Sequence, residues 1–188
     1  MCGIFGYLGA RGATPILIDG LRRLEYRGYD SAGLAVLNSE ITVKKCIGRV
    51  DDLDSIIPGG IHGNIGIAHT RWATHGGVTD ANAHPHLSED GKVAIVHNGI
   101  IENSRALRRW LTAEGIVLQS ETDSEVLVHL IHRALGDGLS PENSVRRALR
   151  HTRGTWGLCA LFAEEGVIVC ARNGSPLVIG VGHGENYV

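Results

Sequence analysis

The sequence lacks an excess of charge of either sign. Its 188 residues contain 18 Lys and Arg against 20 Asp and Glu, a formal net charge of −2, and no basic stripe of the kind that binds nucleic acid. The densest basic cluster, Arg146, Arg147, Arg150 and Arg153, has the spacing of a solvated helix face. The charge pattern therefore predicts no nucleic-acid partner.

Long apolar runs and paired cysteines are also missing. No run approaches the roughly 20 apolar residues that a membrane-spanning helix needs, so we expect no membrane partner. The apolar start of the chain has no basic segment before it, which argues against a secretory signal and for a cytoplasmic protein. No Cys-x-x-Cys pair occurs, and we expect free thiols. The four cysteines are Cys2, Cys46, Cys159 and Cys170.

The composition is that of one globular domain. Hydrophobic residues make up 43% and charged residues 20% of the chain, which excludes extensive disorder, and the length fits a single domain. Patterning predicts strands at 3–8, 31–37, 41–47, 65–70, 93–98, 155–162, 167–172 and 177–181. It predicts helices from Pro15, with Thr14 as N-cap, and at 50–57, 104–114, 123–135 and 141–150. Because regular βαβ alternation is missing, we expect an α+β layered fold.

Cys2 is a candidate nucleophile at the N-terminus. Removal of the initiator methionine, expected before a small residue, would leave a thiol and a free α-amine on one residue. Their unperturbed pKa values, about 8.5 and 7.7–8.0, suit a nucleophile and its base. A Met-Cys start is more often a chance occurrence, although the apolar segment 3–8 would hold it on a strand.

Asn98 and Gly99 are candidates for an oxyanion site. They follow the apolar segment 93–96, and an Asn amide and a Gly N–H at a strand end are suitable donors. Taken alone, Asn-Gly more often indicates a simple turn.

The segment 71–92 is long, irregular and rich in Gly, Asn, His and Pro, which is typical of a functional loop. Arg71 could bind a carboxylate with its forked guanidinium, and Thr74 and His75 could add hydrogen bonds. On its own, Trp72 is interpreted as a packed core ring.

A His-x-His pair and an acidic residue complete the candidates. His84 and His86 could bind zinc from one side of an extended segment, but this pair alone is a weak signal, so we expect neither metal nor cofactor. Spacing alone favours Thr122 or Asp123 as a helix N-cap. The functional alternative is that Asp123 binds a substrate ammonium group.

Seven motifs occur together and in a familiar order. The chain resembles the glutaminase domains of class II glutamine amidotransferases, which are N-terminal-nucleophile hydrolases, and within them the glucosamine-6-phosphate synthase family. Amidophosphoribosyltransferase and asparagine synthetase share the Cys-Gly-Ile start. The motifs are MCGIFGYLG at 1–9, LRRLEYRGYDSAGLAV at 21–36, GIAHTRWATHG at 66–76, NAHPH at 82–86, VHNGIIEN at 96–103, SETDSEV at 120–126 and GSPLVIG at 174–180.

The resemblance implies an αββα four-layer sandwich that hydrolyses L-glutamine to glutamate and ammonia. It implies that Cys2 is the nucleophile and forms a thioester, with its own α-amine as the general base. This base is lost if the initiator methionine is retained. Asn98 and Gly99 match the oxyanion hole, and His84 lies in a loop near the site.

The resemblance also implies how glutamine is held. Arg71 matches the group that binds the α-carboxylate, with Thr74 and His75 lining the same pocket. Asp123 matches the partner of the α-ammonium group, and Trp72 matches a residue linked to gating and ammonia passage. One cationic and one anionic anchor suit a zwitterionic substrate.

Further expectations concern the extent of the domain. We expect a single glutaminase domain over 1–188 that is incomplete at its C-terminus, with an open strand edge. The sugar isomerase domains are absent, so fructose 6-phosphate is expected as a partner only of a full-length enzyme, which would convert it to glucosamine 6-phosphate. A homodimer is left open. The alternatives are an inactive or glutamine-binding fragment, or another class II amidotransferase such as amidophosphoribosyltransferase.

Overall fold

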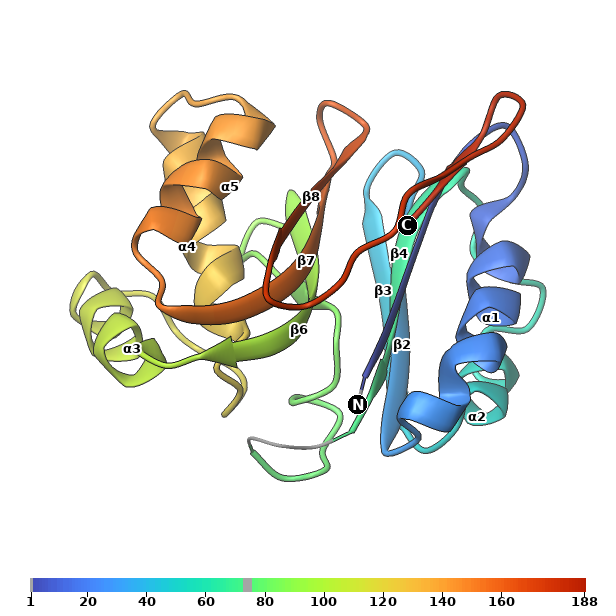
Figure 1. Ribbon diagram of the computed structural model, residues 1–188, viewed down its shortest axis with the longest axis horizontal. Helices are drawn as coiled ribbons and strands as arrows, with labels where there is room; N and C mark the ends of the chain where they lie inside the picture. Colours follow the sequence, from blue (N-terminus) through green and yellow to red (C-terminus); the bar gives the residue numbers. More distant parts are fainter. Residues whose placement is uncertain (1, 73–75) are drawn as a thin grey trace.

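The computed structural model describes residues 2–72 and 76–188, which form four layers in the order helix, sheet, sheet, helix (Figure 1). A six-stranded sheet, sheet A, packs face to face with a four-stranded sheet, sheet B. Each sheet carries helices on its outer face (Figure 1). This arrangement confirms the predicted αββα sandwich.

Sheet A contains both ends of the described chain. Its strand order is β3-β2-β4-β1-β10-β9, and every neighbouring pair is antiparallel. The long strands match their predicted positions to within one residue. The strands are β1 (Gly3–Leu8), β2 (Ser31–Leu37), β3 (Ile41–Ile47), β4 (Ile65–Arg71), β9 (Gly180–Val181) and β10 (Asn186–Tyr187).

Sheet B is built around the long strand β6. The order is β5-β6-β7-β8, again antiparallel throughout. The strands are β5 (His86–Leu87), β6 (Val93–Ile101), β7 (Gly154–Phe162) and β8 (Val167–Asn173).

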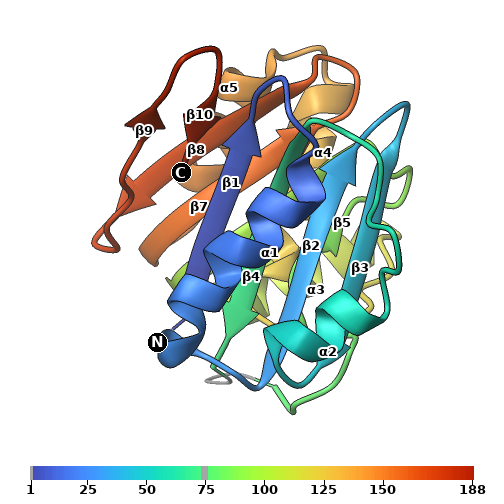
Figure 2. The ribbon, with the colours of Figure 1, turned by 90° about the vertical axis from the view of Figure 1, so that its right-hand side faces the viewer.

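The helices cover the two outer faces. Figure 2 shows α1 and α2 across the outer face of sheet A, while α3, α4 and α5 lie on the side of sheet B (Figure 1). They are α1 (Ala13–Leu24), followed by a 3-10 turn at Glu25–Arg27, α2 (Val50–Ser55), α3 (Ser104–Ala113), α4 (Glu125–Gly136) and α5 (Pro141–Arg150).

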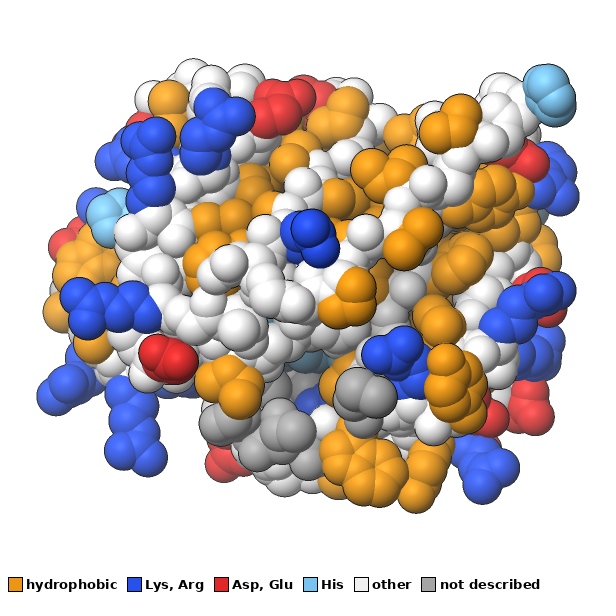
Figure 3. All heavy atoms as spheres, viewed as in Figure 1, with side chains coloured by type: hydrophobic (Ala, Val, Ile, Leu, Met, Phe, Trp, Pro, Cys, Tyr) orange, Lys and Arg blue, Asp and Glu red, His pale blue; other side chains and the backbone are white. Residues whose placement is uncertain are grey.

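Three apolar layers hold the sandwich together. One lies between sheet A and its helices, around Leu17 and Leu21, and another lies between sheet B and its helices, around Leu127 and Ile131. The third fills the space between the sheets. It reaches the surface where the C-terminal segment crosses from sheet B to sheet A, and apolar side chains gather on this face (Figure 3). Burial of this apolar area is the main force that stacks the layers.

Some local predictions were wrong. Thr14 is not the N-cap of α1, because the helix begins at Ala13 and the Thr14 hydroxyl exchanges hydrogen bonds with the backbone of Ile61, donating at 2.8 Å and accepting at 3.1 Å. The predicted strand 177–181 is reduced to Gly180–Val181. In contrast, α5 begins as predicted, and the Ser140 side chain accepts a hydrogen bond from the backbone N–H of Asn143.

Across 2–72 and 76–188, no helix has the length and apolar character to cross a membrane.

Candidate active site

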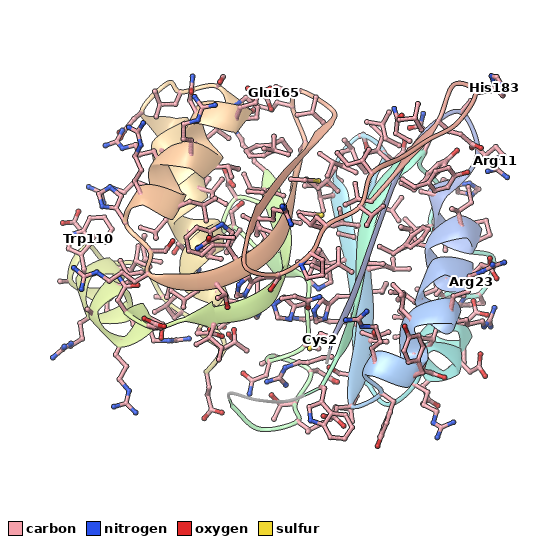
Figure 4. The ribbon with its side chains drawn as sticks, viewed as in Figure 1. Cys2, Arg11, Arg23, Trp110, Glu165 and His183 are labelled. Carbon is pink, nitrogen blue, oxygen red and sulfur yellow. The ribbon has the colours of Figure 1, made fainter. Side chains whose placement is uncertain are left out.

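Cys2 is held where two paired strands end. The register of β1 on β4 puts Gly3 opposite Thr70, so Cys2 lies beside the end of β4, in the space between the two sheets (Figure 4). Its sulfur accepts the N–H of Trp72 at 3.2 Å and lies 3.6 Å from the Trp72 carbonyl oxygen. A Cβ on Gly3 would lie only 2.8 Å from that of Leu24. Strand pairing and close packing therefore fix the thiol in place.

Strand β6 brings the amide of Asn98 to this cysteine. Asn98 Nδ2 donates to the Cys2 carbonyl oxygen at 3.1 Å, and Asn98 Oδ1 lies 2.9 Å from Nε2 of His69. Burial lowers the pKa of His69 to about 4, so the ring is neutral at physiological pH and carries one N–H. An amide oxygen only accepts, so this N–H is on Nε2. The histidine thus orients the amide with Nδ2 toward Cys2.

Gly99 follows on the same strand with a conformation that other residues rarely adopt. Its φ is +142°, and a Cβ there would overlap the carbonyl oxygen of Thr155 on β7. Glycine alone lets β6 keep its pairing at this point.

Arg71 and Asp123 bring opposite charges to the same cavity. Arg71 ends β4, is 4% exposed and donates from Nη1 to the Gly77 carbonyl oxygen at 3.1 Å. Asp123 is 8% exposed, and its Oδ2 accepts the N–H of Ile101 at 2.7 Å. Burial lowers the pKa of Arg71, and the negative charge of Asp123 is among the groups that oppose this shift.

The helix-cap interpretation of Asp123 was wrong. Helix α4 begins at Glu125, with Ser124 as N-cap. The carboxylate of Asp123 is bonded to β6 instead, while the hydroxyl of Thr122 accepts the N–H of Glu125 at 3.4 Å. Asp123 therefore faces the cavity from the loop before α4.

Trp72 is not a core ring. Its side chain is 42% exposed, and it packs edge-to-face on Tyr29 with ring centroids 5.2 Å apart. Trp72 nevertheless lines the cavity, and its backbone N–H donates to the Cys2 sulfur.

All predicted site residues that the structure describes line one cavity of about 40 Å³. Thr74 and His75 lie outside the described residues. The residues that meet at the cavity are Cys2, Arg71, Trp72, His84, Asn98, Gly99 and Asp123.

Buried histidines stack behind the site. The ring of His84 lies 4.3 Å from that of His69 and 4.6 Å from that of His86, measured between centroids. His86 Nε2 lies 3.0 Å from the Thr122 hydroxyl, and neither nitrogen of His84 has a hydrogen-bond partner in the described part of the chain. Burial holds the pKa of His84 and that of His86 well below the usual range. Both rings are therefore neutral. Within residues 2–72 and 76–188, no group of three or more His, Cys, Asp or Glu side chains could hold a metal ion.

The sequence alone predicts no role for His69 or for His97, whose Nδ1 lies 2.8 Å from the Ser124 hydroxyl. Both line the cavity. The sequence does contain one signal for these two residues, a histidine within an apolar strand segment. A polar group buried in this way requires a hydrogen-bond partner. The partners themselves come from other segments and are visible only once the strands pair.

Comparison with known proteins agrees with this geometry. Residues 69–188 match the family model described as "Glutamine amidotransferase domain". The chain is 52% identical over its whole length to glutamine–fructose-6-phosphate aminotransferase (isomerizing) of Chlorobaculum tepidum, and 54% identical to that of Idiomarina loihiensis. It covers 32% and 31% of these proteins, so the chain spans about a third of the length of these relatives.

Solved structures show the same fold. Glutamine phosphoribosylpyrophosphate amidotransferase of B. subtilis superposes with a TM-score of 0.86 at 26% identity, and an allosteric regulatory enzyme of purine biosynthesis with 0.87 at 27%. Each match covers the whole of this chain and 41% of the other. The sandwich is thus that of the N-terminal-nucleophile amidotransferases. The chain belongs to the glutamine amidotransferase domain family.

Proposed function

We propose that this chain hydrolyses the side-chain amide of L-glutamine to glutamate and ammonia at the cavity beside Cys2. One observation carries the proposal: a thiol, an amide donor and two opposite charges meet at one cavity, although Cys2, Asn98, Arg71 and Asp123 come from four separate segments. In a full-length protein like the relatives named above, the ammonia would convert fructose 6-phosphate to glucosamine 6-phosphate.

The two charges suit the zwitterionic end of glutamine. Arg71 can bind the α-carboxylate with two parallel hydrogen bonds, and Asp123 can accept from the α-ammonium group. Both side chains are nearly buried, where charge pairing is stronger than in water. Fixing both groups directs the side-chain amide toward the thiol, and such positioning accounts for much of the rate gain in a two-reactant step.

Cys2 supplies the nucleophile, and its α-amine supplies the base once Met1 has been removed. The amine takes the thiol proton, and the sulfur attacks the amide carbon of glutamine. The resulting tetrahedral oxyanion collapses as the ammonium group returns the proton to the departing nitrogen, which leaves as ammonia. Water then adds to the thioester with the amine as base, the thiol leaves, and glutamate is released.

Asn98 and Gly99 stabilise the charge that develops on the substrate oxygen. The amide of Asn98 already points toward Cys2 because His69 holds its oxygen, so little reorganisation is needed when the oxyanion forms. Because its lowered pKa leaves His69 neutral, the ring supplies a hydrogen bond to Asn98 and adds no positive charge to that of Arg71.

Two alternatives fit less well. An amidophosphoribosyltransferase is disfavoured, because identity to the structure named as a phosphoribosylpyrophosphate amidotransferase is 26%, against 52–54% for the glutamine–fructose-6-phosphate aminotransferases. A chain that only binds glutamine would need the anchors but not a thiol and an amide donor held together, and both are present here.

The test compares two cysteines by their effect on ammonia release from glutamine. Cys2→Ala is expected to abolish release and to retain glutamine binding in calorimetry. Cys46→Ala is the matched control: this thiol lies half-buried on β3, away from the cavity, and its loss should leave the rate unchanged. Release by Cys2→Ala at the parent rate would refute the proposal. Binding without release in the parent chain would favour the binding-only alternative.

A further inference from the structure

Two cysteines face each other in sheet B, outside the cavity. The register of β7 on β8 puts Cys159 opposite Cys170, and their sulfur atoms lie 3.4 Å apart. Both residues belong to the apolar layer between the sheets. Neither lines the cavity beside Cys2, and the proposed hydrolysis uses neither of them.

We propose that Cys159 and Cys170 form an oxidisable dithiol, which a peroxide converts into a cross-strand disulfide. This modification site is independent of the proposed function, because it involves other residues, another strand pair and another reagent.

The strand geometry permits the bond with a small movement. A disulfide needs sulfur atoms about 2.05 Å apart and Cβ atoms about 3.5–4.5 Å apart. Directly opposed residues in antiparallel strands have Cβ atoms about 4.5–5.5 Å apart, which meets the upper end of this range. The sulfur atoms, which lie 3.4 Å apart, must approach each other by about 1.3 Å to reach the bond length. Since β8 lies at the edge of sheet B and its one partner among the described strands is β7, it can shift without breaking a second ladder.

The two thiols differ in a way that suits stepwise oxidation. Cys159 is completely buried, whereas Cys170 is partly exposed on the edge strand. The hydrogen bond between them lowers the pKa of Cys170, because the Cys159 thiol can donate to its thiolate, and the same bond together with burial raises the pKa of Cys159. Cys170 is therefore the accessible nucleophile, and Cys159 is the protonated partner beside it.

The oxidation balances with one peroxide. The Cys170 thiolate attacks one oxygen of hydrogen peroxide, the O–O bond breaks, and a sulfenic acid and hydroxide form. The Cys159 sulfur then attacks the sulfenic sulfur, the S–O bond breaks, and water leaves with the Cys159 proton. Two thiols are oxidised to one disulfide, and one peroxide is reduced.

The sequence offers a direct way to detect the bond. Trypsin cleaves after Arg153 and Arg172, so both cysteines fall in the single peptide 154–172. The native chain is treated with hydrogen peroxide, free thiols are blocked under denaturing conditions, and the peptide is weighed. We expect a mass lower by two hydrogen atoms than that of the unblocked dithiol, with no blocking group attached. Cleavage at Glu164 and Glu165, between the cysteines, should leave two pieces joined until a reductant is added.

Single variants and a lone thiol supply the controls. In Cys159→Ser the partner is missing, so Cys170 should stop at the sulfenic acid and be trapped by a cyclic diketone. In Cys170→Ser the buried Cys159 should be recovered as a blocked thiol. Cys46, a half-buried thiol on β3, should also be recovered as a blocked thiol in the parent chain.

Two results from the parent chain would overturn the proposal, whether or not the variants fold. One is recovery of peptide 154–172 with both thiols blocked, in a sample whose Cys2 has been oxidised. The other is a sulfinic or sulfonic acid on Cys170 while Cys159 remains a free thiol.

Discussion

Replacing Asn98 by alanine separates catalysis from packing at the site. The variant loses the donor that points toward Cys2 at 3.1 Å. A single oxyanion donor of this kind is worth about 2.7–4 kcal/mol in the transition state, so kcat for glutamine hydrolysis should fall by roughly 10²–10³. KM should change little, because Arg71 and Asp123, the proposed anchors of glutamine, remain. The substitution also leaves the buried N–H of His69 without an acceptor, which should lower the free energy of unfolding by about 1–3 kcal/mol.

Asn103→Ala is the matched control for this experiment. Asn103 also makes two hydrogen bonds, to the His151 carbonyl oxygen and from the Arg153 N–H, each at 2.8 Å, but it is not among the residues that line the cavity. It should lose stability in urea unfolding and keep its kcat. If Asn98→Ala retained kcat within about threefold of the parent, or if both variants lost kcat equally, the oxyanion role of Asn98 would be refuted.

Gly99, His69 and Trp72 each carry a further testable expectation. Gly99→Ala should lower the free energy of unfolding by roughly 2–3 kcal/mol, because φ is +142° and the new Cβ would overlap the Thr155 carbonyl; urea unfolding equal to the parent would contradict this. From about pH 7 to pH 5 the free energy of unfolding should fall by about 2 kcal/mol through His69 alone. Its pKa is lowered by burial from 6.5 to about 4, so the unfolded chain takes up the proton first as the pH falls. The pKa of Glu125 is lowered to about 2, so its contribution to the free energy of unfolding is lost only below about pH 4.5. A free energy of unfolding that is unchanged between pH 7 and pH 5 would therefore contradict a buried, neutral His69 ring. Glutamine bound to Cys2→Ala protein should change tryptophan fluorescence, because Trp72 lines the cavity; the change should vanish on adding Trp72→Phe, and its persistence would assign the signal to another tryptophan and contradict this prediction.

Much of the fold follows from local patterning. Strands at Ser31–Leu37 and Ile41–Ile47 and the helix at Pro141–Arg150 have the predicted bounds. In the helix, Ser140 accepts a hydrogen bond at the cap and proline occupies the first turn, a start that is visible in the sequence. Such elements are specified by neighbours in the chain.

Elements that depend on partners far away in the sequence were not predicted. The two-residue strands β5 and β10 exist only because β6 and β1 offer free edges to pair with. Thr14 resembled a cap in sequence, yet its hydroxyl is bonded to Ile61, 47 residues away. Nothing in either segment alone indicates such a contact.

The same division holds at the site. Cys2, Asn98 and Arg71 were predicted from their chemistry and from the family motifs, and the structure brings them to one cavity. The support of the Asn98 amide by His69 was not predicted, because it depends on β4 and β6 facing each other across the two sheets. The roles of these residues remain predictions, and those of Thr74 and His75 do as well.

The central claim is that Cys2, with a free α-amine, is the nucleophile for glutamine. The most direct measurement is mass spectrometry of the intact chain after treatment with an electrophilic glutamine analogue, followed by mapping of the modified peptide. The account predicts a chain without Met1 that carries one adduct, on the sulfur of Cys2, and protection by excess glutamine. Ammonia release by a chain that retains Met1, or an adduct on any other residue, would contradict it.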